Sequence, residues 1–323
     1  MTLRLFNGNR LERLSGALAE SLRDPLPSPL EEECLVVQSD GMSRWVSMEL
    51  ARLLGVAANL RFFYPNGFVD FIHRRVFEEA LTPACLDRET LTWRILALLP
   101  ALSREEAFRP IRHYIEGDGD PLKRLQLADQ IADTLDQYML YRPDWIFRWE
   151  NGGDDHWQAA LWRSLVDVCG PDHRAGRARA LLECLQKRAA PVDRLPRRVS
   201  VFGSSTLPPF HLELLAALGE FTDVNLFLLN PCREYWGGIL SDAEMGRVAA
   251  KAGRSVPEED LHLEKGNSLL ASLGTLGRDF FDRIFQYDVE DIPLHEDPGE
   301  ETLLRCLQAD MLHLREREGK EKK

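Results

Sequence analysis

The first sixty residues alternate between short apolar runs and longer stretches with helical periodicity. Residues 3–6 predict a short strand, followed by a polar turn and an amphipathic helix with Leu14 and Leu18 on one side. Residues 34–38 predict a second, buried strand, and residues 39–41 (Ser-Asp-Gly) have the composition of a helix-capping segment. We therefore expect the chain to begin strand, helix, strand, helix.

A long region with helical spacing follows. From about residue 63 to residue 188, strand signals are absent, and apolar residues recur three or four positions apart. Leu91, Ile95 and Leu98 form one such set. This region predicts a helical subdomain.

After Pro196 the alternation of strands and helices returns. Residues 199–202 and 224–229 predict buried strands, and the segment between them predicts a helix through Leu212 and Leu218. Residues 267–286 predict one further helix. Short buried strands that alternate with helices indicate a parallel sheet covered by helices.

The helical block interrupts the sheet domain in the sequence. We expect a core formed by residues 1–62 and 192–290, with an inserted all-helical subdomain at 63–191. Residues 291–323 predict a helix and a charged linker, as at the point where a longer protein has been cut. In superfamily-1 helicases, a helical subdomain interrupts the first motor domain in the same way. By analogy, the predicted fold class is α/β with a RecA-like parallel sheet.

Composition indicates an ordinary globular protein. The chain has 323 residues, of which 44% are hydrophobic and 28% charged, enough apolar material for about two cores. We expect a cytoplasmic protein without membrane contact, because the chain has no signal peptide and no window near the roughly 18 apolar residues of a membrane span. The six cysteines never form a Cys-x-x-Cys pair, which favours buried free thiols over disulfides or zinc ligands.

The formal net charge of −12 argues against a protein that coats nucleic acid, because affinity for phosphate comes mainly from lysine and arginine. Basic clusters at residues 73–75, 173–179 and 194–198 could still contact DNA. For each of them, a solvated helix face or linker is the alternative.

The residues that a helicase motor needs are missing. A RecA-like fold would carry a phosphate-binding loop after its first strand, but that turn reads Asn7-Gly8-Asn9-Arg10, and the only Gly-Lys pair is Gly319-Lys320 in the tail. The strand at 199–202 runs into Gly203-Ser204-Ser205, where a magnesium-holding acid is expected. Asp154-Asp155-His156 comes closest to a metal site, but it follows Asn-Gly-Gly and reads as a solvated turn. The sequence predicts no catalytic residue, cofactor or metal.

The predicted helix around residues 125–138 carries a polar stripe. Its polar positions lie opposite an apolar face of Leu125, Ile131, Leu135 and Tyr138, and they are Gln126, Asp129, Asp133, Asp136 and Gln137. Aspartate can accept from the amino group of cytosine, and glutamine can pair with the edge of adenine, which suits the reading of exposed bases. A plain solvent-exposed face is the alternative that these residues alone leave open.

Short strings along the chain carry a family resemblance. Among them are Asn9-Arg10-Leu11, Val37-Gln38-Ser39, Arg112-His113-Tyr114, Leu135-Asp136-Gln137-Tyr138, Tyr141-Arg142-Pro143-Asp144-Trp145, Leu207-Pro208-Pro209 and Asn230-Pro231-Cys232-Arg233. In this order they resemble the RecC family, a subunit of the bacterial RecBCD complex (exodeoxyribonuclease V). RecC chains are about three times longer, so the resemblance covers only their amino-terminal, helicase-like portion.

The resemblance implies a helicase fold that has lost its motor. RecC would then be a non-catalytic subunit that binds RecB and RecD, splits forked DNA and guides the 3′-ended single strand, contributing to Chi recognition in double-strand break repair and homologous recombination. A purely architectural domain that holds RecB and RecD without reading bases is the alternative.

The resemblance also implies site residues. The family's Chi-recognition positions match Gln38, Asp133, Asp136, Gln137, Arg142 and Arg174, and this chain departs from the family pattern at Asp40, Arg44, Tyr64, Asp70 and Thr134. On this basis the acids and Gln137 would contact base edges, the two arginines would pair with phosphate or guanine, and Tyr64 would stack on a base. The departures leave the recognised sequence open.

Overall fold

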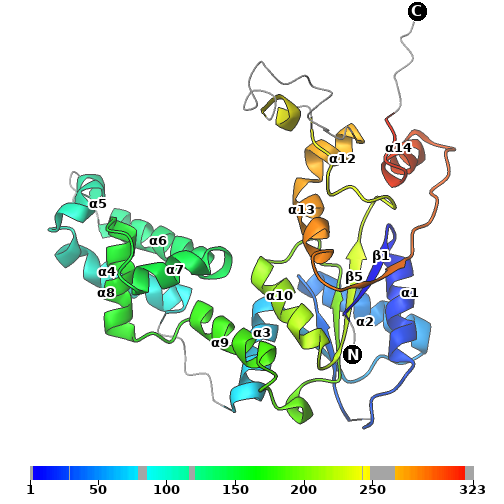
Figure 1. Ribbon diagram of the computed structural model, residues 1–323, viewed down its shortest axis with the longest axis horizontal. Helices are drawn as coiled ribbons and strands as arrows, with labels where there is room; N and C mark the ends of the chain where they lie inside the picture. The colour runs from blue at the N-terminus through cyan, green and yellow to red at the C-terminus, as the bar shows by residue number, and fades with distance from the viewer. Residues whose placement is uncertain are drawn as a thin grey trace, which may run out of the picture. The chain divides into compact units, whose positions relative to one another are not determined.

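The computed structural model describes residues 3–28, 30–78, 86–115, 121–241, 243–247 and 266–316. The chain divides into two compact units (Figure 1). The sheet unit comprises Met1–Phe68, Leu195–Leu207 and Leu215–Lys323, and the helical unit comprises Val69–Arg194 and Pro208–Leu214. Each unit is therefore built from segments that are distant in sequence.

A parallel sheet of six strands forms the centre of the sheet unit. Its strands run in the order β3-β2-β4-β5-β1-β6, and every neighbouring pair is parallel. The strands are β1 (Leu3–Gly8), β2 (Glu33–Val36), β3 (Leu60–Phe63), β4 (Arg198–Phe202), β5 (Asp223–Leu229) and β6 (Glu290–Pro293). The predicted α/β class with a parallel sheet is confirmed.

The two edge strands were not predicted. β3 has only four residues and pairs with β2 alone, while β6 reads Glu-Asp-Ile-Pro and pairs with β1 alone. An edge strand needs no continuous apolar run because one side faces away from the sheet, and it tolerates proline. Both strands therefore lack the pattern that revealed the four inner ones.

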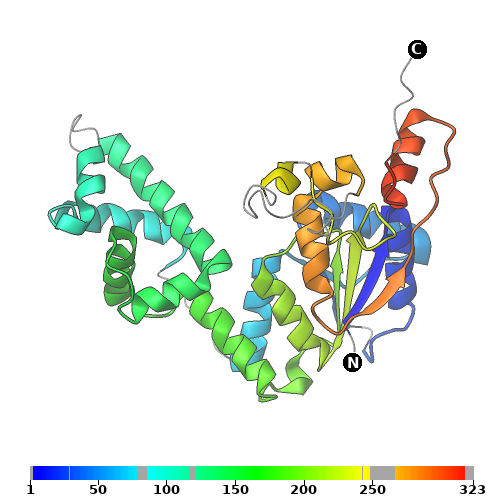
Figure 2. The same cartoon turned by 45° about the horizontal axis from the view of Figure 1, so that its top comes forward.

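Helices cover both faces of this sheet. The helices of the sheet unit are α1 (Leu11–Leu22), α2 (Asp40–Leu54), α10 (Pro209–Gly219), α12 (Ser268–Leu273), α13 (Thr275–Ile284) and α14 (Leu303–Leu312), with α3 (Pro65–Phe77) beginning in this unit and α10 ending in it. The predicted cap of α2 is confirmed, since Ser39 Oγ accepts from Met42 N at 3.1 Å. α1 and α2 pack on one face through Leu14, Val46 and Leu50, whereas α10 and α13 lie on the other (Figure 2).

The predicted single helix at 267–286 is wrong. It is broken at Gly274, between α12 and α13. A Cβ atom on Gly274 would stand 2.9 Å from the ring of the buried Trp236 and 2.4 Å from the carbonyl oxygen of Leu270. Only glycine permits this close approach, so the tertiary contact with Trp236 accounts for the break.

The helical unit is built around one apolar cluster that includes Ile95, Leu135 and Trp162. Its helices are the rest of α3, α4 (Arg88–Leu102), α5 (Arg109–Ile115), α6 (Pro121–Tyr141), α7 (Pro143–Glu150), α8 (Trp157–Cys169) and α9 (Arg174–Gln186), with short 3-10 turns at Glu106–Phe108 and Val192–Arg194. Its described residues contain no strand. None of the described helices in either unit is long and apolar enough to cross a membrane.

The cysteines that the structure describes carry free thiols. Cys34 and Cys232 are buried, whereas Cys169, Cys184 and Cys306 are partly exposed. Burial raises the pKa of the Cys232 thiol to about 11, so this group stays protonated and unreactive at neutral pH. The sixth cysteine, Cys85, lies outside the described residues, as do Gly319-Lys320 and the end of the charged tail.

Acid is expected to destabilise the helical unit through His211. This side chain is only 4% exposed, and its burial, together with the nearby charge of Arg174, lowers the pKa of His211 to about 4. Because the unfolded chain binds a proton near pH 6.5 and the folded chain does not, stability falls as pH drops from about 6.5 towards 4. Between pH 7 and pH 5 the loss should be about 2 kcal/mol.

Urea unfolding at the two pH values, followed by circular dichroism, measures this loss. The variant His211→Gln cannot bind the proton and should show a drop that is smaller by about the same amount. An equal pH dependence in the variant would rule out His211 as the cause.

Candidate functional site

Four of the predicted site residues lie where the parallel strands end. Gln38 follows β2, and its amide Nε2 donates to the carbonyl oxygen of Thr206, in the loop after β4, at 2.7 Å. Tyr64 follows β3, and its hydroxyl donates to Asp40 Oδ1 at 2.5 Å. Arg44 lies one turn beyond Asp40 on α2 and is exposed. We call Gln38, Asp40, Arg44 and Tyr64 the strand-end set.

The hydrogen bond between Tyr64 and Asp40 fixes both side chains. It raises the pKa of the Tyr64 phenol, since the bond is lost when the phenol ionises. Tyr64 nevertheless stays 48% exposed, so a large part of its side chain is accessible to a ligand. Tyr64 therefore presents an accessible aromatic side chain that its hydrogen bond to Asp40 holds in place.

The sheet has a topological switch point between β1 and β5. The connection from β1 leads towards β2 on one side, whereas the connection from β5 leads towards β6 on the other. Open α/β sheets bind ligands in the crevice that such a point creates at the carboxyl ends of the strands. A cavity of about 590 Å³ lies there, and its lining includes Asn9, Arg10, Leu229, Pro231 and Met311.

The chain itself fills part of this crevice. The Asn9 amide donates to the carbonyl oxygen of Glu296 at 2.8 Å and accepts from its N–H at 2.9 Å. The Glu296 carboxylate pairs with Arg10 at 3.2 Å and with Arg13. A Cβ atom on Gly8 would stand 3.1 Å from the carbonyl oxygen of Leu294. A carboxylate of the chain thus lies at the amino end of α1, where a motor protein would bind phosphate.

The other six predicted residues lie in the helical unit, on and around α6. Asp133 is half exposed and pairs with Arg88 at 3.4 Å, and the Thr134 hydroxyl donates to the carbonyl oxygen of Gln130 at 2.8 Å. Gln137 is exposed on the same helix. Most of the polar stripe predicted for this helix is therefore exposed or half exposed, whereas the Asp136 side chain is only 17% exposed and Ile131 and Leu135 are buried.

Two arginines flank that stripe. Arg174 is the first residue of α9. Its guanidinium donates to Asp136 Oδ1 at 2.9 Å, and about a third of its side chain is exposed. Arg142 lies between α6 and α7 and is exposed, with its guanidinium 5.5 Å from the ring centroid of Trp145. We call Asp133, Thr134, Asp136, Gln137, Arg142 and Arg174 the helical set.

Sequence reasoning missed Arg88. This residue begins α4 and pairs with Asp129 at 3.2 Å as well as with Asp133, so it holds two carboxylates of the stripe. Arg88 is 41 residues from Asp129, and no spacing rule connects them. Only the packing of α4 against α6 reveals the pair.

The candidate metal cluster is a structural turn. The Asp154 carboxylate accepts from Trp149 Nε1 at 3.0 Å and from Arg148 at 2.9 Å, while His156 Nδ1 accepts from Ala159 N and caps α8. No group of three or more His, Cys, Asp or Glu side chains among the described residues could hold a metal ion. Asp154 and His156 thus act within the local fold.

The similarities to known proteins all point to one family. The family model "RecC, N-terminal domain" matches residues 3–314. The RecBCD enzyme subunit RecC of Escherichia coli is 35% identical over 98% of this chain, that of Haemophilus influenzae is 30% identical over 96%, and that of Mycolicibacterium smegmatis is 28% identical over 96%.

These relatives are much longer than the chain. It spans 31%, 33% and 28% of their respective lengths, or about a third. Because the family model covers almost every residue and the similarity to the first two relatives is strong throughout, the chain belongs to the RecC family and matches its N-terminal domain.

Proposed function

We propose that this chain is the non-catalytic, helicase-like leading module of a RecC subunit, which guides the 3′-ended single strand and contributes to Chi recognition within a RecBCD assembly. The assembly would act in double-strand break repair and homologous recombination. RecB, RecD, and single-stranded and forked DNA are the proposed partners, and the cytoplasm is the proposed location. The relatives are named as RecC subunits of the RecBCD enzyme, and the other assignments follow from the family resemblance.

The geometry of the sheet supports a helicase core that has lost its motor. We propose a RecA-like core from residues 1–62 and 192–290 with an inserted helical subdomain at 63–191. The turn after β1 lies at the switch point, as in a nucleotide-binding domain. There, however, Asn9 donates a hydrogen bond to the backbone of Glu296, and Arg10 pairs with the Glu296 carboxylate. This internal carboxylate pairs with Arg10 and Arg13, which are then not free to bind a phosphate, and this favours a module without nucleotide hydrolysis.

The observation that carries the proposal is the helical set. Arg174 holds the Asp136 carboxylate, Arg88 holds Asp133, and Gln137 and Arg142 are exposed nearby in the same chain segment. Ion pairs of this kind restrict rotamers, and restricted side chains can present acceptors and donors to base edges in a defined pattern. The assignment of these residues to Chi recognition is carried over from the resemblance to the RecC family, and the exposed polar geometry supports it.

One observation favours the architectural alternative. The guanidinium groups of Arg88 and Arg174 already pair with carboxylates of the chain itself, and the net charge of the chain is −12. Fewer arginines are then free to neutralise DNA phosphates. In this second candidate function, the module would hold RecB and RecD together without contacting bases.

A Chi-response assay with the full-length subunit in complex with RecB and RecD tests the proposal. Asp136→Asn keeps the shape of the side chain but removes its charge, and we expect the response to fall roughly ten-fold, the size of one lost base contact. The unwinding rate should stay within about two-fold, because no motor residue is changed. Asp129→Asn is the matched control, since Asp129 lies on the same helix and is likewise paired with an arginine, Arg88, but matches no recognition position.

Crosslinking separates the two candidate functions. A photoreactive residue at Gln137, which is exposed, should react with a 3′-tailed DNA strand if the helical set faces the strand. Silence at Gln137 in an active complex, together with a normal Chi response of Asp136→Asn, would refute strand reading and leave the architectural role.

A further inference from the structure

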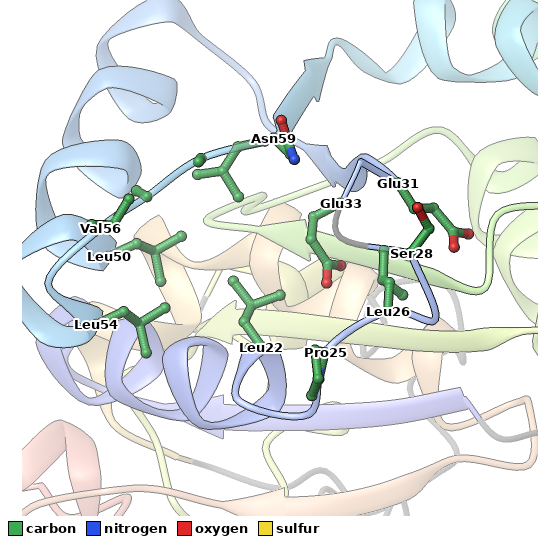
Figure 3. A pocket seen from close by; sticks show the side chains of 13 residues that line it. Leu22, Pro25, Leu26, Ser28, Glu31, Glu33, Leu50, Leu54, Val56 and Asn59 are labelled. Carbon is green, nitrogen blue, oxygen red and sulfur yellow. The ribbon is translucent and has the colours of Figure 1, made fainter.

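A second cavity lies at the opposite end of the sheet, by the amino ends of β2 and β3. Its volume is about 280 Å³, and it opens between the carboxyl-terminal turns of α1 and α2 and the loops that lead into these strands (Figure 3). Leu22, Leu50 and Leu54 lie on one side of it, and Glu31 and Glu33 lie on the other. No residue of the strand-end set lines it, so its occupant would not compete with a DNA strand at those residues.

The apolar surface extends beyond the cavity. Val56 belongs to the lining and is 73% exposed, and Leu30, between the lining residues Ser28 and Glu31, is 84% exposed. Large aliphatic side chains with this exposure, one in the lining and one on the loop that contributes to it, are typical of a surface that another molecule covers. A ligand confined to the cavity would contact Val56 but not Leu30, whereas a protein segment is large enough to cover both.

The charge of the lining is negative. It contains two carboxylates and neither lysine nor arginine. Arg198 neutralises Glu33, with its Nε donating to the carboxylate at 3.1 Å, but no cation among the described residues pairs with Glu31. The carboxyl end of α2 adds the partial negative charge of its terminal carbonyl groups. An incoming cation would therefore be attracted to the side of the cavity where Glu31 lies.

We propose that this cavity docks a segment of another subunit of the assembly, which inserts one or two apolar side chains and places a lysine or arginine next to them against Glu31. The inference rests on the proposed function in one respect, namely that the chain works in complex with RecB and RecD. The cavity volume of about 280 Å³ is just below the range of about 300–1,000 Å³ for small-molecule sites, which suits an inserted side chain. Buried apolar anchors with a charged rim are the common composition of such interfaces.

Photo-crosslinking in the complex of the full-length subunit with RecB and RecD tests this docking site. A photoreactive residue in place of Val56 should link to a segment of RecB or RecD that has a lysine or arginine within a few residues of an aliphatic or aromatic one. The matched control replaces Met48, which is also on the surface near α2's end and 74% exposed but does not line the cavity. It should give no link to that segment.

Charge reversal provides an independent measurement. Glu31→Lys should weaken the binding of the crosslinked subunit roughly three- to ten-fold, because it places like charges together at the rim. Glu89→Lys, an exposed acid of α4 in the helical unit, should leave that binding unchanged.

Several outcomes would overturn the inference. They are links from Val56 to its own chain, to a second copy or to DNA, no link at all in a complex that assembles and unwinds DNA, or unchanged binding by Glu31→Lys. These results leave the proposed function intact. A subunit that fails to assemble with RecB and RecD would instead overturn the proposed function, and this inference with it.

Discussion

Replacing Arg198 by alanine is expected to lower the free energy of unfolding of the sheet unit by about 3–5 kcal/mol. Arg198 begins β4, and its guanidinium binds the Glu33 carboxylate on β2 and the carbonyl oxygens of Ser21 and Asp24 at the end of α1. The two charged side chains are only 10% and 14% exposed. Without Arg198, Glu33 would keep a charge in a poorly hydrated place with no partner, which is the costly way to break such a pair.

Chemical unfolding of the full chain measures this loss, with hydrogen exchange of the β2 and β4 amides reporting the sheet unit. Arg197→Ala is the matched control, because Arg197 is the exposed neighbour on the same segment, and its loss should cost at most about 0.5 kcal/mol. The double variant Arg198→Met with Glu33→Leu should recover most of the stability, since both charges are gone. A loss below about 1 kcal/mol for Arg198→Ala would contradict this account.

The inner strands and their helices were predictable because their burial leaves a local pattern. β4 and β5 are buried on both faces and mostly apolar, as expected for strands between two helical layers, and Ser39 marks the start of α2. β3 and β6 gave no such pattern, because an edge strand is defined by its neighbour rather than by its own composition. The break at Gly274 likewise depends on Trp236, which is far from it in sequence.

The candidate site was predictable only as a set of residue types. Gln38 and the stripe on α6 could be selected because a strand end and a helix face follow from local periodicity. The contacts that hold these side chains in place could not be predicted from the sequence. Arg88 reaches Asp129 across 41 residues, and Asn9 reaches Glu296 across 287, distances at which no sequence pattern carries information about contact.

The resemblance to RecC, not the physical pattern, selected the recognition residues from the other polar positions. Asp129 and Asp133 look alike in sequence, and the structure gives both the same partner, Arg88. Their proposed difference in function therefore rests on the family match, which is why Asp129→Asn is the informative control in the Chi-response assay.

Replacing Trp162 by alanine is expected to destabilise the helical unit by about 3–5 kcal/mol. Trp162 is fully buried on α8, and its indole Nε1 donates to Glu150 at 3.0 Å. The same carboxylate lies 2.7 Å from Nε2 of the buried His173, whose ring meets Trp162 edge-on at 5.4 Å. The substitution thus removes a large side chain and leaves Glu150 with one donor fewer, so the cavity cost and the polar cost add.

Unfolding monitored by hydrogen exchange of α8 and α9 measures the effect, and Trp93→Ala is the matched control. Trp93 lies in the same unit but is 64% exposed, so its loss should cost less than about 1 kcal/mol. Equal losses for the two variants would contradict the argument from burial.

The Trp162→Ala substitution should also disturb the helical set. His173 caps α9 by accepting from Gly176 N at 3.1 Å, and Arg174 follows it directly. Because Trp162 and Glu150 hold the His173 ring, their loss loosens the start of α9 and with it the contact between Arg174 and Asp136. We therefore expect Trp162→Ala to reduce the Chi response of the full complex as Asp136→Asn does, although Trp162 itself is buried and cannot touch DNA.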